Sequence, residues 1–222
     1  HIVAHGSPEL IDTWVRPTVA GEMIGSLGIT EPGGGSDVGN IRTTAVRDGD
    51  HWVINGSKTF ITSATRADFV TTAVRTGPPG AGGISLIVVP TTTPGFTVDR
   101  KLAKMGWHSS DTAELSYVDV RVPLTNLVGD ENAGFWYIAE QFVVERMWGA
   151  YTVVGACELA LERTAQYLRE RQAFGEPLLA KQYIQFTLAE LSAELDLLRS
   201  YNYSIADLYG RGEDTTRQST IA

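Results

Sequence analysis

The sequence predicts an α+β fold in which a β-barrel domain is followed by the helices of a C-terminal helical bundle. Short apolar stretches separated by Gly, Pro and Asn turns recur at regular spacing from residue 21 to about residue 128, as in a barrel or sandwich. From about residue 131 onward the apolar residues follow a helical period. We therefore expect a helix tail and linker over 1–20, a β-domain over 21–128 and bundle helices over 129–222.

The first twenty residues contain the signals of one short helix. Ser7 is a suitable N-cap, and Pro8 occupies the first helical position, where its missing N–H is not needed. We expect Pro17 to end this helix.

The expected strands are bounded by turn residues. Asp48-Gly49-Asp50 predicts a hairpin, and Asn55-Gly56 predicts the next turn. The Gly- and Pro-rich stretch 76–83 predicts a loop. The strands are expected over 23–29, 43–47, 51–55, 58–62, 69–75, 85–90, 96–99 and 113–120.

Two long helices are expected in the second half. The stretch Met147–Cys157 has no charged residue and several small ones, which favours a helix buried on several sides. Gly175-Glu176-Pro177 should break this helix. The second helix carries a seam of apolar residues at spacings of four and three, which predicts packing along a neighbouring helix. The seam consists of Ile184, Leu188, Leu191, Leu195 and Leu198.

Composition excludes several classes of protein. Hydrophobic residues make up 43% and charged residues 20% of the 222 residues, which is ordinary for a water-soluble domain. A net charge of −8 argues against nucleic-acid binding and against a basic membrane-surface protein. No apolar run is long enough to span a membrane. The single cysteine, Cys157, excludes an internal disulfide and a Cys-based zinc site, fits a reducing compartment, and leaves no metal site expected.

The stretch Leu27–Asp37, LGITEPGGGSD, is the most informative one. Three consecutive glycines allow the backbone to take positive φ and to approach a ligand closely. Exposed amides in such a turn, followed by the Ser36 hydroxyl, suit a phosphate or pyrophosphate. Three glycines alone fit a plain surface turn better. The pattern is neither GxGxxG nor GxxxxGK[ST], so it supports neither a Rossmann nor a P-loop site.

The whole string resembles the flavin-binding TEPxxGSD segment of acyl-CoA dehydrogenases, and three further motifs of that family follow in order. The resemblance covers about residues 10–222. It implies FAD as the cofactor, bound first by Leu27, Ile29, Thr30, Gly35 and Ser36. It also implies a middle β-barrel domain and the beginning of a C-terminal four-helix bundle, so we expect the chain to be an excerpt of a longer enzyme.

The second motif extends the implied FAD site, and the third marks a loop of the β-domain. Phe60, Ile61 and Thr62 match a Trp/Phe-Ile-Thr/Ser tripeptide that lies against the flavin ring, with the hydroxyl near N5. The string 104–115, KMGWHSSDTAEL, is similar to the loop before the last barrel strand, and His108 is not expected to be catalytic.

The last motif is R-x-x-F-G…Q, matched by Arg171, Phe174 and Gln182. In the family the arginine and glutamine reach the FAD of a neighbouring subunit. A guanidinium suits a pyrophosphate because its donors are forked and its charge is permanent. Alternatively, these residues only end a helix, with Arg171 favourable to the helix dipole.

Glu145 is the candidate catalytic base. A Leu-x-x-Glu-Arg pattern carries the base in the isovaleryl- and long-chain-like subgroup, and residues 142–146, FVVER, match it except at the first position. Apolar neighbours should raise the pKa of Glu145, which suits a base that removes an α-proton. Two alternatives stay open: a surface ion pair with Arg146, or a base located beyond Ala222. The expected acyl-CoA contacts are Ser36, Trp136, Val143, Val144 and Arg146.

The resemblance implies α,β-dehydrogenation of an acyl-CoA thioester to a trans-2-enoyl-CoA. It further implies electron transfer to an electron-transferring flavoprotein and a homotetramer, cytoplasmic if bacterial and in the mitochondrial matrix if eukaryotic. Acyl-CoA oxidases and flavin monooxygenases of the same fold, and a flavin-free scaffold subunit, are the alternatives.

Overall fold

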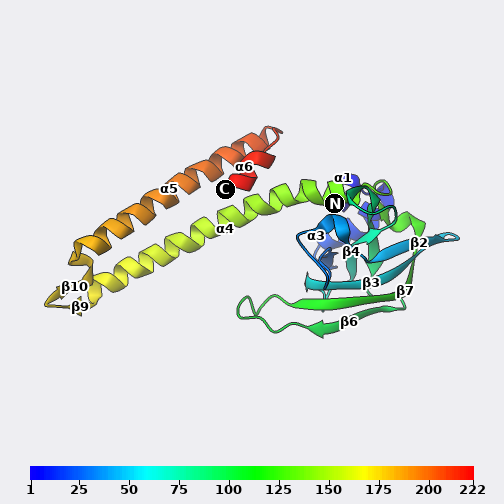
Figure 1. Cartoon of the computed structure of the whole chain (residues 1–222), viewed down its shortest axis with the longest axis horizontal. Coiled ribbons are helices and arrows are strands. Elements are labelled where there is room, and N and C mark those ends of the chain that lie inside the picture. Colours follow the sequence, from blue (N-terminus) through cyan, green and yellow to red (C-terminus); the bar gives the residue numbers. More distant parts are fainter. The chain divides into compact units, whose positions relative to one another are not determined.

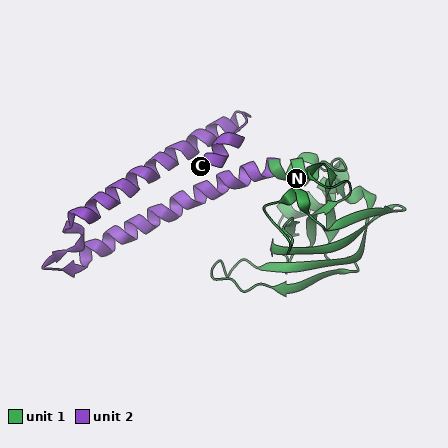
Figure 2. Ribbon diagram, viewed as in Figure 1, with its two compact units in different colours: residues 1–139 green, residues 140–222 purple.

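The computed structural model describes residues 1–222 and divides the chain into two compact units, residues 1–139 and 140–222 (Figure 2). Unit 1 contains a short helical segment and a β-sheet, and unit 2 is almost entirely helical (Figure 1). Helix α4 (Gly134–Glu170) begins in unit 1 and continues into unit 2. The domain boundaries expected at residues 20 and 128 stay predictions.

The N-terminal segment is helical almost throughout. It consists of α1 (Ile2–His5), α2 (Pro8–Leu10), a π-helical stretch (Ile11–Val15) and α3 (Arg16–Val19). The Ser7 hydroxyl accepts a hydrogen bond from the Leu10 amide at 3.2 Å, which confirms the predicted N-cap. The expectation that Pro17 ends the helix is wrong. Pro17 lies in the first turn of α3, where an N–H is not needed.

The main sheet of unit 1 has eight strands, in the order β6-β7-β3-β2-β4-β5-β8, with β1 pairing in parallel with β4. The sheet is not closed, so the expectation of a β-barrel is wrong, although the α+β fold class is confirmed. The strand order ends at β6 on one side and at the two-residue β8 on the other, and these two strands do not pair with each other. The strands are β1 (Gly25–Gly28), β2 (Thr44–Asp48), β3 (His51–Thr62), β4 (Phe69–Arg75), β5 (Ile84–Pro90), β6 (Phe96–Lys101), β7 (Thr112–Pro123) and β8 (Leu127–Val128).

Strand β3 is longer than expected. Asn55-Gly56 does not form a turn, because β3 continues through it with only an irregularity in its pairing to β7. The Asn55 side chain is instead bonded to Asp119, donating to its carboxylate at 3.0 Å and accepting from its amide at 2.9 Å. Gly56 has φ +149°, and a Cβ at this position would lie 2.5 Å from the Thr43 hydroxyl. Long-range contacts therefore override the local turn preference of Asn-Gly.

The core of unit 1 is formed by residues from most strands of the sheet. Alternate residues of β3 and β7 point into it, which is the period-two pattern of a half-buried strand. Strands β4 and β5 are buried along almost their whole length. The core includes the large buried side chains of Trp52, Ile54, Leu115 and Tyr117.

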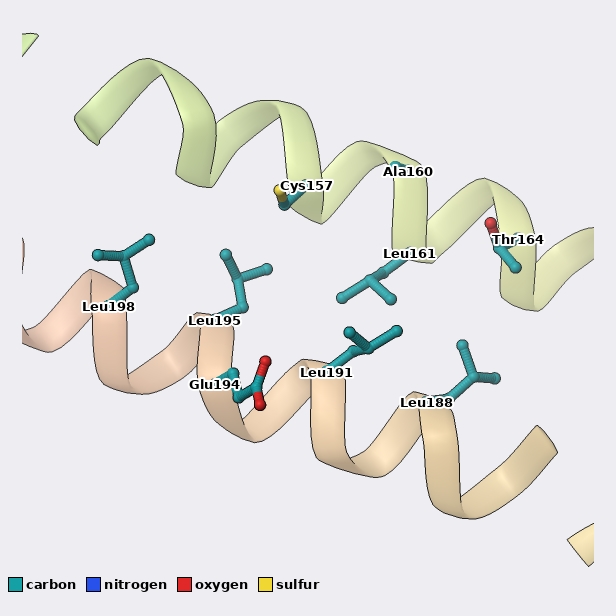
Figure 3. A pocket seen from close by; sticks show the side chains of 9 residues that line it. All are labelled: Cys157, Ala160, Leu161, Thr164, Leu188, Leu191, Glu194, Leu195 and Leu198. Atoms are coloured by element: carbon teal, nitrogen blue, oxygen red, sulfur yellow. The ribbon is translucent and has the colours of Figure 1, made fainter. Parts of the chain in front are cut away.

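Unit 2 is a helical hairpin. Helix α4 is joined to α5 (Gln182–Gly210) by a small hairpin, β9 (Gln172–Ala173) and β10 (Glu176–Pro177), and a short α6 (Thr216–Ile221) follows. The predicted leucine seam of α5 does point toward α4, across a groove of about 440 Å³ (Figure 3). The Tyr151 hydroxyl donates to the Asn202 carbonyl at 3.2 Å and links the two helices.

The expectation that Met147–Cys157 is buried on several sides is wrong for this chain. Only Met147 and Val154 are buried, and the others are exposed or half-buried. Within unit 2 only α5 and α6 are available to pack against this stretch, so most of its surface has no apolar partner.

Candidate active site

A β-bulge near the end of β3 determines which side chains leave the core. Lys58 pairs with Leu115 and Ile61 with Ala113, so two residues of β3 oppose a single residue of β7. Phe60, in the bulge, has φ +59°, a strained conformation for an aromatic residue. As a result Lys58 and Ile61 are buried, whereas Phe60 is 66% exposed. Thr62 is exposed as well.

The segment that follows β1 lies directly beside this bulge. The Thr59 amide donates to the Thr30 carbonyl at 2.8 Å, and the Ser26 hydroxyl donates to the Thr62 carbonyl at 2.5 Å. A Cβ on Gly28 would lie 3.0 Å from the Val70 side chain of β4 and 3.6 Å from Lys58 Cγ of β3, so β1 packs closely against both strands. The structure thus brings together the two segments predicted to contact the flavin, 27–30 and 60–62. Leu27 and Thr30 are half-buried, and Ile29 is buried.

Behind these segments lies a buried ion pair. The Lys58 ammonium, with a fully buried side chain, donates to Glu31 at 2.9 Å and to the Ile29 carbonyl at 3.0 Å. The Glu31 carboxylate also accepts the amides of Arg42 and Thr43, at 2.6 and 2.9 Å. Burial acts to raise the pKa of Glu31, but the Lys58 charge and these hydrogen bonds outweigh it and lower the pKa. Burial lowers the pKa of Lys58 to about 8.

The glycine turn (Gly33–Ser36) follows Glu31 of this ion pair and is exposed to solvent. Glu31 and Gly34 exchange two backbone hydrogen bonds, each of 3.0 Å. The Gly34 amide is therefore already used within the turn, whereas those of Gly35 and Ser36 make no hydrogen bond within the chain. A Cβ on Gly34 would meet nothing within 4 Å, so the side of the turn is open. Exposed amides beside the Ser36 hydroxyl are suitable donors for an anionic group.

A groove of about 470 Å³ lies beside the end of β3 and β1. Trp14 and Phe69 line it together with Leu27 and Thr62. Ser36 borders a separate hollow of about 510 Å³, with Gly80 and Phe135. This site suits a ligand that carries a flat heteroaromatic ring and phosphate groups. The apolar walls and the exposed Phe60 ring fit the faces of the ring, the Thr62 hydroxyl fits a polar edge of the ring, and the glycine turn fits the phosphates.

A second buried carboxylate fixes the turn that follows Thr62. Asp111 is 7% exposed and accepts hydrogen bonds from the Thr65 amide and the Arg66 side chain, both at 2.9 Å. The Ser63 amide donates to the Asp111 carbonyl at 3.1 Å. Burial acts to raise the pKa of Asp111, but these hydrogen bonds prevail and hold the pKa below its ordinary value.

The predicted base lies on α4 in unit 2. Glu145 is an exposed residue by its accessible surface, yet desolvation by its surroundings raises the pKa of its carboxyl above the ordinary value, against a hydrogen bond from Gln141. Arg146 is exposed and is not among the groups that shift this pKa. This argues against the alternative that Glu145 only forms a surface ion pair with Arg146. Val143 and Val144 are half-buried. Trp136, in the part of α4 that belongs to unit 1, is 63% exposed.

The last predicted group surrounds the small hairpin of unit 2. Phe174 and Gly175 both have positive φ, +56° and +85°, and form a tight two-residue turn. This turn leaves Phe174 96% exposed. Arg171 and Gln182 flank the hairpin with exposed side chains, so all three groups are accessible from outside the unit.

Sequence reasoning missed the supporting residues Lys58 and Asp111, and it read Glu31 only as part of the glycine string. One signal could have found Lys58. It lies in a strand whose alternate residues Trp52 and Ile54 are core residues, so period two places its side chain inside.

The comparisons with known proteins agree with this geometry. Residues 26–120 match the family described as acyl-CoA dehydrogenase, middle domain, and residues 132–222 match acyl-CoA dehydrogenase, C-terminal domain. The chain is 39% identical over 212 residues to the long-chain specific acyl-CoA dehydrogenase of Rattus norvegicus mitochondria, covering 94% of this chain and 49% of that protein. It is 36% identical over 222 residues to an acyl-CoA dehydrogenase of Bacillus subtilis, covering 100% and 59%.

A crystal structure of a probable acyl-CoA dehydrogenase from Mycobacterium abscessus superimposes with a TM-score of 0.95 at 54% identity, covering 100% of this chain and 59% of that one. The two units are therefore those of a middle and a C-terminal domain of one enzyme class. The chain belongs to the acyl-CoA dehydrogenase family. It spans about half the length of the curated relatives it matches. None of the helices combines the length and the apolar character that crossing a bilayer demands.

Proposed function

We propose that the protein is an FAD-dependent acyl-CoA dehydrogenase that converts an acyl-CoA thioester into its trans-2-enoyl-CoA. The observation that carries this proposal is the side-by-side position of segments 27–30 and 60–62, which are 30 residues apart in sequence yet joined by the Thr59–Thr30 and Ser26–Thr62 hydrogen bonds. Family membership supports the same cofactor and the same class of substrate.

The residues of unit 1 divide the binding of FAD between them. The amides of Gly35 and Ser36 would hold the pyrophosphate, and Thr62 would donate to the polar edge of the ring while Phe60 shields its face. Leu27, Ile29, Thr30 and Ile61 complete this wall. From the small hairpin of unit 2, Arg171, Phe174 and Gln182 would contact the FAD of a neighbouring subunit in a homotetramer.

Glu145 would remove the α-proton of the acyl group with its carboxylate. A carboxylate whose pKa is raised by desolvation is a stronger base than an ordinary carboxylate. Proton transfer to it from a weakly acidic carbon is therefore less unfavourable. Bound FAD supplies the acceptor for the β-hydride, so the proton and the electron pair leave the substrate in one oxidation. Ser36, Trp136, Val143, Val144 and Arg146 would hold the acyl-CoA.

The partner and the compartment follow the same reasoning. We propose an electron-transferring flavoprotein as the electron acceptor; one structural neighbour is described as the electron transferring flavoprotein of Acidaminococcus fermentans, at 33% identity and a TM-score of 0.91. Relatives occur in bacteria and in mitochondria, which supports a cytoplasmic or a matrix enzyme respectively.

Replacing Glu145 by Gln in the protein as its gene encodes it tests the base. We expect turnover to fall by about 10²–10⁴-fold with FAD still bound, because Gln keeps the shape but cannot accept the proton. Glu140→Gln, five residues earlier on the same helix, is the control and should keep wild-type turnover. Near-normal turnover of Glu145→Gln would disprove this assignment and point to another carboxylate.

An oxidase is the second candidate. A prolyl acyl carrier protein oxidase, AnaB, is a structural neighbour at 26% identity and a TM-score of 0.93. Oxygen consumption by the substrate-reduced enzyme at a rate comparable to turnover would favour the oxidase. Slow reoxidation by oxygen together with rapid reoxidation by an electron-transferring flavoprotein would favour the dehydrogenase.

A further inference from the structure

The buried side chains of Lys58 and Glu31 connect three segments of the chain, because they bond to each other and to backbone groups on either side of the glycine turn. Lys58 Nζ reaches the Ile29 carbonyl at 3.0 Å and Glu31 Oε1 at 2.9 Å. The Glu31 carboxylate in turn holds the amides of Arg42 and Thr43. The pair therefore ties the bulge of β3 to both sides of the glycine turn.

Stability alone is a poor explanation for this arrangement. The side chains of Lys58 and Glu31 are 0% and 7% exposed, and removing two charges from water costs about as much as their attraction returns. Well-packed apolar residues of similar volume are often equally stable or more stable at such positions. The ion pair instead fixes the relative positions of the segments that carry it. A buried donor and a buried acceptor both find hydrogen-bond partners in only one arrangement of these segments.

We propose that Lys58 and Glu31 are positioning residues of the cofactor site, which set the spacing between the glycine turn (Gly33–Ser36) and the bulge with the strand end that follows it (Phe60–Thr62). The inference rests on the proposed binding of FAD and deepens it. One cofactor must meet the amides of the turn and the Thr62 hydroxyl together, so the distance between these groups determines how well it binds.

The packing around the Lys58 stem supports this role. Its Cγ lies 3.6 Å from the place that a Cβ on Gly28 would occupy, so the aliphatic chain passes directly beneath the segment that ends at Thr30. Thr59, the next residue, donates its amide to the Thr30 carbonyl at 2.8 Å. A displacement of Lys58 would thus move the bulge and the strand before the turn relative to each other.

The experiment uses the full-length protein with Lys58→Met, Glu31→Gln and the double variant. Met keeps most of the apolar stem, and Gln keeps the size of the carboxylate. Arg121→Met is the matched control, since Arg121 forms a half-exposed ion pair with Asp48 (2.6 Å) that also joins two strands of the sheet. The measurements are the Kd for FAD, the absorbance spectrum and reduction potential of the bound flavin, and the melting temperature of the apoprotein.

We expect each single variant to weaken FAD binding about tenfold or more and to shift the flavin bands toward those of free FAD. Arg121→Met should change neither. The double variant leaves no unpaired buried charge, so its melting temperature should recover relative to Lys58→Met while FAD binding stays weak. This separation between stability and FAD affinity is what a positioning role predicts and a purely structural role does not.

The outcomes distinguish this inference from the proposed function. Variants that melt at lower temperature but bind FAD with wild-type Kd and spectrum would overturn the inference alone. Should Lys58→Met fail to fold, Glu31→Gln and the double variant decide by the same criteria. A wild-type protein that binds no FAD would overturn the proposed function and this inference together.

Discussion

Replacing Asp111 by Ala should loosen the turn that carries Thr62. The change removes an acceptor that is 7% exposed and bonded to the Thr65 amide and the Arg66 side chain. A hydrogen bond to a charged group contributes about 1.5–3 kcal/mol. The Arg66 side chain is 54% exposed, so its ion pair adds only about 0–1 kcal/mol. Together these contacts suggest a loss of about 2 kcal/mol.

Two measurements follow from this magnitude. The melting temperature should fall by about 4–8 °C, taking about 2–4 °C for each kcal/mol in a chain of this size. Hydrogen exchange at the Thr65 amide should become roughly 30-fold faster if it occurs by local opening. Asp48→Ala, which removes a partner of the half-exposed Arg121 pair, is the control and should change stability by less than about 0.5 kcal/mol.

The effect of Asp111 should also depend on pH. Its pKa is lowered in the folded state, so its contribution is present above the unfolded pKa of about 3.9 and is lost as pH falls through the folded value. The difference between wild type and variant should therefore be full at pH 7 and shrink below about pH 4. A difference within 0.5 kcal/mol at pH 7, with unchanged exchange at Thr65, would refute this account of the turn.

Two further substitutions test the packing and the strain of unit 1. Phe60→Gly should leave the apoprotein as stable as wild type or up to about 1 kcal/mol more stable, because the relief of left-handed backbone strain opposes the entropy cost of glycine. The same variant should bind FAD more weakly. Urea unfolding measures the first effect and FAD titration the second, and a loss of stability without a loss of FAD affinity would contradict the prediction. Leu115→Ala should cost about 2–5 kcal/mol in urea unfolding, because the side chain is fully buried, whereas the half-exposed Leu159→Ala should cost far less; equal costs would contradict the proposed core.

Local sequence patterns predicted some elements well. The strand expected over 69–75 is β4, with the same bounds, because its β-branched residues are buried on both faces and no competing pattern exists. The spacing of Leu188, Leu191, Leu195 and Leu198 predicted which face of α5 points toward α4, because helical spacing is a local property.

Features that depend on distant residues could not be predicted in the same way. Asn55-Gly56 has a strong turn preference, and pairing with β2 and β7, together with side-chain bonds to Asp119, 64 residues away, accompanies its place within a strand. The period of the strand places the Lys58 side chain inside, but no local pattern encodes its pairing with Glu31, 27 residues earlier. Barrel closure likewise depends on the pairing of the outermost strands, which no local pattern encodes.

The open sheet has a consequence for behaviour at high concentration. A sheet that does not close leaves the strands at the two ends of its strand order with an unpaired edge, and such an edge can recruit a strand from another molecule and begin aggregation. At one edge β6 presents the charged run Asp99-Arg100-Lys101, all exposed, which repels such pairing. At the other edge β8 offers only Leu127 and Val128, too short a template to extend. The charged residues of β6 and the short length of β8 therefore protect the open sheet from pairing with other molecules.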